Sequence, residues 1–79
     1  MNSVFDDIVI TVFTTIQAME KEREQQLRAP FHVMYGDLVR RMSIDGITIR
    51  KALNLLWKQQ KIKIGRTIND RYISTNGNR

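Results

Sequence analysis

The sequence predicts a mainly helical α+β domain in which three helices are joined to a small antiparallel β-ribbon. Apolar residues recur at helical spacing in three segments, and after Gln60 their period changes to two. With 79 residues the chain is long enough for one small core. We therefore expect a single domain over residues 1–75, followed by a frayed tail at 76–79.

The first helix is expected from about residue 3 to residue 28. Its apolar stripe consists of Phe5, Ile8, Val9, Val12, Ile16 and Met19. Residues 8–16 are rich in β-branched side chains, which favour strands, but they do not alternate with polar residues and so fit a helix better. Residues 20–26 are polar, so we expect a solvated extension of the helix that ends before Pro30.

The middle of the chain predicts a short strand and two further helices. Residues 31–34 have the composition of an edge strand, and a helix follows over residues 36–42. After a two-residue turn, Asp45 is placed to cap a third helix over residues 46–60 by accepting a hydrogen bond from an amide two or three residues on. The apolar stripe of that helix is Ile49, Ala52, Leu53 and Leu56. Trp57 flanks this stripe, and we interpret it as a packing residue rather than a stacking platform.

Two strands complete the predicted domain. Residues 61–64 alternate basic with apolar side chains, and residues 71–74 have the composition of a strand. The intervening residues 65–70 begin and end with turn formers, so the two segments predict a ribbon with a basic, polar tip.

This order of helix, strand, two helices and two strands resembles the winged helix-turn-helix superfamily of bacterial DNA-binding regulators. The resemblance rests on the pattern Leu38-x3-Met42-x-Ile44-Asp45-x2-Thr48-Ile49-Arg50-Lys51-Ala52-Leu53. It covers residues 31–75 well and the first helix loosely. Residues 48–53 are also similar to the recognition helix of GntR-type regulators, but the glycine-rich wing, the Leu-Pro-Ser entry and the effector domain of that family are missing. The resemblance therefore implies the superfamily fold, with three helices and a wing of two or three strands, and DNA binding as its function.

Charge is divided unevenly along the chain, whose net charge is +5. Residues 1–30 hold three Lys or Arg against five Asp or Glu, whereas residues 31–79 hold ten against three. A basic half beside an acidic half suggests one surface for a polyanion and another for a different contact. The alternative is that these charges serve solubility alone.

The third helix presents a polar and basic face opposite its apolar stripe. In a major groove, Arg or Lys on this face can donate to guanine O6 and N7, and Asn can pair with adenine. We predict base contacts from four residues: Thr48, Arg50, Lys51 and Asn54. Ile47 lies on the same face and would be exposed unless it met a base methyl group or a partner. The alternative for each cation is a solvated face.

Further residues are placed to contact phosphates, either directly or through the wing. They are Arg40, Arg41, Gly46, Lys58, Lys61, Lys63, Arg66 and Arg71. Arg40 and Arg41 lie on the outer side of the second helix, which crosses the DNA backbone in this architecture. Gly46 lets backbone amides approach a phosphate, and it suits a turn equally well. Arg66 is nearest the tip, so we expect it to reach a minor groove or the adjacent phosphates.

The sequence shows no pattern typical of catalysis or metal binding. The chain has no cysteine and a single histidine, His32, so neither a disulfide nor a metal site is expected. No nucleophile–base set, phosphate-binding glycine loop or spaced carboxylate pair stands out, so we expect neither enzyme activity nor a cofactor or small-molecule ligand. No apolar run approaches the length of a membrane span and no secretory signal is evident, so we expect a cytoplasmic protein.

The first helix carries apolar residues beyond one face. Ile10 and Phe13 lie away from its stripe, and a three-helix core cannot cover both. We therefore predict a homodimer through this helix, which would place two recognition helices about one DNA turn apart.

Two function classes follow from these features. The first is a small sequence-specific protein that binds double-stranded DNA, as a transcriptional regulator or an accessory factor of a mobile element. The alternative is a winged-helix protein–protein interaction module acting through the N-terminal helix. RNA binding is disfavoured because no strand interleaves aromatic with basic residues.

Overall fold

The computed structural model describes residues 4–26, 33–66, 68 and 70–76. Its elements, in chain order, are α1 (Val4–Gln25), β1 (Val33–Met34), α2 (Tyr35–Arg41), α3 (Gly46–Lys58), β2 (Ile62–Arg66) and β3 (Arg71–Thr75). The predicted α+β class, with three helices and an antiparallel sheet, is confirmed. No helix within these described residues is long and apolar enough to cross a membrane.

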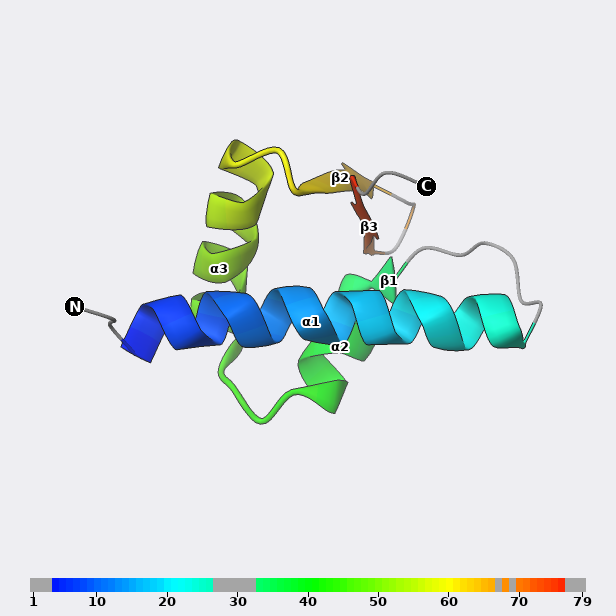
Figure 1. The fold of residues 1–79 in the computed structure, drawn as a ribbon, viewed down its shortest axis with the longest axis horizontal. Coiled ribbons are helices and arrows are strands. Elements are labelled where there is room, and N and C mark those ends of the chain that lie inside the picture. Colours follow the sequence, from blue (N-terminus) through cyan, green and yellow to red (C-terminus); the bar gives the residue numbers. More distant parts are fainter. Residues whose placement is uncertain (1–3, 27–32, 67, 69, 77–79) are drawn as a thin grey trace.

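Helix α1 is the longest element, at about 33 Å, and it runs the length of the molecule in Figure 1. Its β-branched run is helical, as predicted. Thr11 and Thr15 fit the helix because each hydroxyl donates a hydrogen bond to the carbonyl four residues before it. The helix ends at Gln25, short of the predicted residue 28.

The buried face of α1 packs against α3 and the sheet, which lie side by side along one side of α1 in Figure 1. The core consists of Val9, Val12, Ile16, Val33, Leu38, Ile49, Ala52, Leu53, Leu56, Ile62 and Ile73. The predicted stripe of α3 is therefore fully buried, and that of α1 supplies three core residues. Phe5, Ile8 and Met19 pack against this core and are partly buried.

Glu20 departs from the prediction that the second half of α1 is solvated. Its side chain is only 2% exposed. One carboxylate oxygen accepts a hydrogen bond of 3.1 Å from the amide of Thr75, and the other accepts one of 2.7 Å from the Thr75 hydroxyl. A buried carboxylate needs such donors. Glu20 thus fastens α1 to the end of β3, which is 55 residues away in the chain.

Helix α3 begins and ends with defined caps. Asp45 accepts hydrogen bonds from the amide and the hydroxyl of Thr48, as expected for the N-cap, and these bonds lower the pKa of its carboxyl group. At the other end Gln60 has a φ of 62°. The amides of Gln60 and Lys61 donate to the carbonyls of Trp57 and Leu56, which is a Schellman ending. The chain therefore reverses sharply from α3 into β2.

The sheet has the strand order β1-β3-β2, with every pair antiparallel. The two-residue strand β1 lies at one edge, as predicted. The prediction that residues 65–70 form the tip is wrong at its start, because Gly65 and Arg66 pair with Tyr72 and Arg71 inside the hairpin. The ring of Tyr72 covers Gly65 so closely that a Cβ there would lie 2.1 Å from it, so only glycine fits. The prediction of a frayed tail over residues 76–79 is wrong at its start, because the backbone amide of Asn76 donates to the carbonyl of Lys61 at 2.8 Å. Residues 77–79, His32 and Pro30 lie outside the described residues.

Candidate nucleic-acid interface

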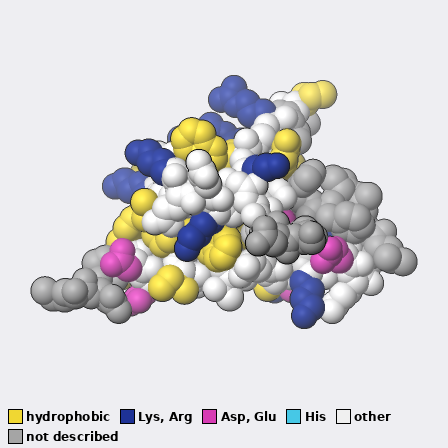
Figure 2. Space-filling view, turned by 45° about the horizontal axis from the view of Figure 1, so that its top comes forward, with side chains coloured by type: hydrophobic (Ala, Val, Ile, Leu, Met, Phe, Trp, Pro, Cys, Tyr) yellow, Lys and Arg dark blue, Asp and Glu magenta, His cyan; other side chains and the backbone are white. Residues whose placement is uncertain are grey.

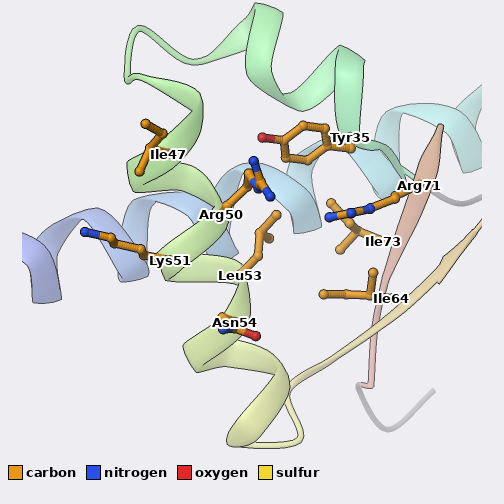
Figure 3. A pocket seen from close by; sticks show the side chains of 9 residues that line it. All are labelled: Tyr35, Ile47, Arg50, Lys51, Leu53, Asn54, Ile64, Arg71 and Ile73. Carbon is orange, nitrogen blue, oxygen red and sulfur yellow. The ribbon is translucent and has the colours of Figure 1, made fainter.

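A groove opens between α3 and the sheet, and we call it the cationic groove. Its lining consists of Tyr35, Ile47, Arg50, Lys51, Leu53, Asn54, Ile64, Arg71 and Ile73 (Figure 3). Its volume is about 440 Å³. The groove brings together three of the four predicted base-contacting residues with one predicted wing residue.

One wall of the groove is the outer face of α3. Because Ile49, Ala52, Leu53 and Leu56 bury one side of this helix, the side chains at positions 47, 50, 51 and 54 are turned to solvent. Arg50, Lys51 and Asn54 are all exposed, as predicted from the helical period. Ile47 is 66% exposed, so most of its surface is not covered by the described residues.

The other wall comes from the hairpin. Side chains two residues apart lie on one face of a strand, so Arg71 shares a face with buried Ile73. Arg66 is opposite Arg71 in the register and therefore lies on the same face. In Figure 3, Arg50 and Arg71 point toward one another across the groove.

The charges along the groove are all positive. None of the eight Asp and Glu residues of the chain, all of which are described, belongs to its lining. Among the described residues, the recorded ion pairs involve Arg23, Arg40 and Arg41, but not Arg50, Lys51 or Arg71. On the face shown in Figure 2, most of the visible Lys and Arg side chains lie in the upper part, whereas the visible Asp and Glu side chains lie lower. Arginines that face each other without a counter-charge repel, and a bound anion would relieve that repulsion.

The floor of the groove is apolar. Leu53 and Ile73 are buried beneath it, while Ile64 is 38% exposed at its side. The hydroxyl of Tyr35 donates a hydrogen bond of 3.3 Å to the carbonyl of Gly46, which fastens the first turn of α3 to α2. The groove can therefore accept an anionic ligand that also carries flat or apolar groups.

Thr48 and Gly46 have structural roles at the start of α3, and the DNA contacts expected of them stay predictions. The Thr48 hydroxyl donates to the Asp45 carboxylate at 2.6 Å, so this hydroxyl is already engaged in capping α3. Thr48 does not line the cationic groove. Gly46 is half-buried beneath Tyr35, and a Cβ there would lie 3.4 Å from the Tyr35 hydroxyl.

Arg40 and Arg41 lie in a different hollow, between α1 and α2, which we call the ion-pair hollow. It is lined by Met19, Glu22, Arg23, Gln26, Asp37, Arg40 and Arg41. Arg41 donates two hydrogen bonds to Glu22, at 2.8 and 2.6 Å, and they lower the pKa of that carboxyl group. Arg40 donates to Asp37, which Arg23 also approaches at 3.6 Å. These arginines are exposed as predicted, but carboxylates already neutralise them.

The remaining predicted phosphate contacts divide between two places. The ammonium group of Lys61 lies 5.8 Å from the centre of the Phe13 ring, on the α1 side of the molecule. Lys58 and Lys63 share a third hollow with Trp57, beyond the end of the cationic groove. Lys63 is one residue from Ile64 along β2 and so projects from the opposite face of the sheet.

Trp57 is the surface residue that the sequence interpretation missed, because 53% of its side chain is exposed. The interpretation of this residue as part of the packing is therefore wrong for half of the side chain. The exposed position of Trp57 could have been recognised from its spacing in the sequence. Trp57 lies seven residues after Arg50 and three after Asn54, and such spacings place side chains on one face of a helix.

The predicted contact residues on α1 differ in exposure. Ile10 is 64% exposed, whereas Phe13 is half-buried against the core. The residues one turn from Ile10 along α1 are Asp6, Asp7, Phe13 and Thr14. Ile10 therefore has one apolar neighbour on this helix surface, the half-buried Phe13.

Comparisons with protein-family models, with curated proteins and with solved structures found no match for this chain. Within the described residues, no three His, Cys, Asp or Glu side chains are grouped so that they could hold a metal ion.

Proposed function

We propose that this protein binds double-stranded DNA through the cationic groove, in a winged helix-turn-helix arrangement. In this proposal α3 is the recognition helix and lies in the major groove, while the β2–β3 hairpin is the wing. The observation that carries the proposal is that Arg50 and Arg71 point toward one another across a groove that Lys51 also lines and that has no acidic residue in its lining.

The dimensions of α3 suit this role. With 13 residues it is about 20 Å long, and the major groove of B-DNA, about 12 Å wide, admits an α-helix. Arg50 and Lys51 are placed to donate to guanine O6 and N7, and Asn54 is placed to pair with adenine. Ile47, at the first turn, offers an apolar contact for a thymine methyl group.

The hairpin extends the same positive surface. Arg66 and Arg71 form a cross-strand pair at the end of the hairpin that is farthest from the α3–β2 turn. Side chains at that position reach phosphates or a minor groove beside the site occupied by α3. Sequence-specific binding of this kind fits a transcriptional regulator or an accessory factor of a mobile element.

The alternative of a protein-interaction module acting through α1 has less support. Ile10 has one apolar neighbour on the surface of α1, the half-buried Phe13, and so small an exposed apolar area is ordinary on protein surfaces. A homodimer through α1 remains a prediction. We expect sedimentation at micromolar concentration to give twice the monomer mass, and Ile10→Glu to give the monomer mass. A monomer mass for the unchanged protein would contradict the dimer.

The test of DNA binding is a salt series with a labelled random-sequence duplex, followed by fluorescence anisotropy. Among the described residues, six cations around α3 and the hairpin take part in none of the ion pairs: Arg50, Lys51, Lys58, Lys63, Arg66 and Arg71. If about six phosphates are neutralised, the logarithm of the affinity falls with that of the salt concentration with a slope of roughly −5. On a random-sequence duplex we expect Arg50 and Lys51 to contact phosphates instead of preferred bases. The double change Arg50→Ala/Lys51→Ala should therefore reduce low-salt affinity by at least about tenfold and make the slope shallower by about two.

The matched control is Arg40→Ala/Arg41→Ala, which removes the same charge from the ion-pair hollow. We expect this variant to bind nearly as well as the unchanged protein, because its arginines are already paired with carboxylates. Absence of binding at low salt, or equal losses in the two double variants, would overturn the proposal. Thermal melts of both variants show whether each is folded.

A further inference from the structure

A second positive hollow lies at the C-terminal end of α3, and we call it the Trp57 hollow. It is lined by Trp57, Lys58, Gln60, Ile62, Lys63 and Asn76, and its volume is about 450 Å³. Trp57 is the only tryptophan of the chain, and about half of its side chain is exposed. Tryptophan is usually well buried in a folded domain, so half-exposure beside two lysines is unusual for a packing residue.

The Trp57 hollow continues the line of the cationic groove. Arg50, Asn54 and Trp57 follow one another at spacings of four and three residues along the exposed face of α3. Trp57 therefore lies about 10 Å farther along the helix axis than Arg50, which corresponds to about three nucleotide steps. A nucleic-acid strand that leaves the cationic groove in this direction reaches the Trp57 hollow.

The walls of the hollow are held in place by the turn that follows α3. The side-chain amide of Asn76 donates to the carbonyls of Gln60 and Ile62, at 3.2 and 3.3 Å. Ile62, which also lines the hollow, is buried in the core, so the hollow is bordered by a core residue. The site is thus built before any ligand arrives.

The chemistry of the hollow selects its occupant. Its lining holds two lysines and no acidic residue, so an anion is favoured. The exposed indole face favours a flat, aromatic group. A nucleotide supplies both the anion and the flat group, since each base has a π-face and each backbone unit has a phosphate. An acidic peptide supplies the charge but not the repeated flat group.

We propose that Trp57, Lys58 and Lys63 form a stacking site for one unpaired nucleotide. The base lies on the indole ring, and the flanking phosphates lie against the two lysines. The protein therefore prefers a duplex that carries a short single-stranded extension to a blunt duplex. This inference rests on the proposed function in one point: the double-stranded part of the ligand is bound by α3.

The fluorescence of Trp57 provides a direct test, because no other tryptophan contributes to it. Three probes are compared: a blunt duplex, the same duplex with an adenine tail of about six nucleotides, and the same duplex with an abasic tail of equal length. Tails at the 5′ and 3′ ends are both examined. We expect strong quenching with one of the adenine tails and binding about tenfold tighter than to the blunt duplex. The abasic tail, which keeps the phosphates, should give little of either effect.

Variants connect the preference to the side chain. Trp57→Ala should abolish the tenfold preference in anisotropy measurements, while Trp57→Phe should retain part of it. Val4→Ala shortens an exposed apolar side chain on α1, away from the predicted dimer contact, and should leave the preference unchanged. Circular dichroism confirms that each variant is folded.

The outcomes separate this inference from the proposed function. Equal binding of adenine and abasic tails, or a preference that survives Trp57→Ala, overturns the stacking site even if the duplex is bound. Stronger quenching by a glutamate-rich peptide than by the tailed duplex assigns the hollow to a protein partner and also overturns it. Tail-dependent quenching that persists in Arg50→Ala/Lys51→Ala, without any affinity for the blunt duplex, upholds the stacking site and rejects the major-groove role of α3.

Discussion

The cationic groove and the ion-pair hollow have the same volume, about 440 Å³, and each is lined by three Lys or Arg side chains. They differ in what those side chains face. In the ion-pair hollow, Glu22 and Asp37 accept hydrogen bonds from Arg41 and Arg40. In the cationic groove no acidic residue is part of the lining. Equal numbers of cations thus give one neutralised surface and one surface that remains open to an anion.

This difference has a physical origin in chain topology. α1 carries most of the acidic residues, and it passes beside α2, so the arginines of α2 meet carboxylates. α3 and the hairpin lie farther along the chain, where Asp45 is used as a helix cap and Asp70 accepts hydrogen bonds from the amides of Gly36 and Arg71. The basic half of the sequence therefore has few carboxylates left for its own side chains.

The largest expected effect comes from reversing one charge in each region. Arg71→Glu places a carboxylate in the cationic groove, where it would face phosphate, and like charges at an interface cost several kcal/mol. We expect the affinity for duplex DNA to fall about 100-fold, as measured by fluorescence anisotropy at low salt. Arg40→Glu makes the same change of charge in the ion-pair hollow and should reduce affinity by less than about threefold. A similar loss in both variants would show that only net charge matters.

A smaller effect is expected when two carboxylates on α1 are removed one at a time and the free energy of unfolding is compared. Glu20→Ala leaves the part-buried amide and hydroxyl of Thr75 without this acceptor and should lower the free energy of unfolding by about 2 kcal/mol. Glu22→Ala breaks only an exposed pair and should cost clearly less. Urea unfolding of both variants measures the difference. Equal losses would mean that burial does not distinguish the two carboxylates.

The face of α3 that lines the groove was predictable because burial of one side of a helix determines which residues face solvent. The Asp45 cap was predictable for a similar reason, since it depends on residues three positions apart. The ion pair between Arg41 and Glu22 joins residues 19 positions apart. Such a contact depends on how α1 and α2 pack, and no local pattern reports it.

Two further departures have the same explanation. Polar residues after Met19 indicated solvation, yet Glu20 is buried because β3 supplies donors from 55 residues away. Gly65 indicated a turn, yet it lies within β2 and pairs with Tyr72. A glycine suits this position because the ring of Tyr72 occupies the space that a side chain would need. Trp57 is different: its exposed position was present in the helical period, and the general tendency of tryptophan to pack led to the wrong interpretation.

The smallest expected effect is the pH dependence of the Arg41–Glu22 pair. Hydrogen bonds from Arg41 lower the pKa of the Glu22 carboxyl group in the folded protein. The stability that this pair contributes is therefore fully present above the unfolded pKa of glutamate, about 4.3, and is lost as the pH falls through the lower folded value. Thermal melts of the unchanged protein and of Arg41→Ala should differ slightly at neutral pH and converge in acid. High salt should reduce the same difference, because both side chains are exposed.

The control is Arg50→Ala. Arg50 has no carboxylate partner among the described residues, so the small effect of this change on the melting temperature should not vary over the same pH range. A gap between Arg41→Ala and the unchanged protein that stayed constant from neutral to acidic pH would show that Arg41 stabilises the protein by packing rather than by its charge.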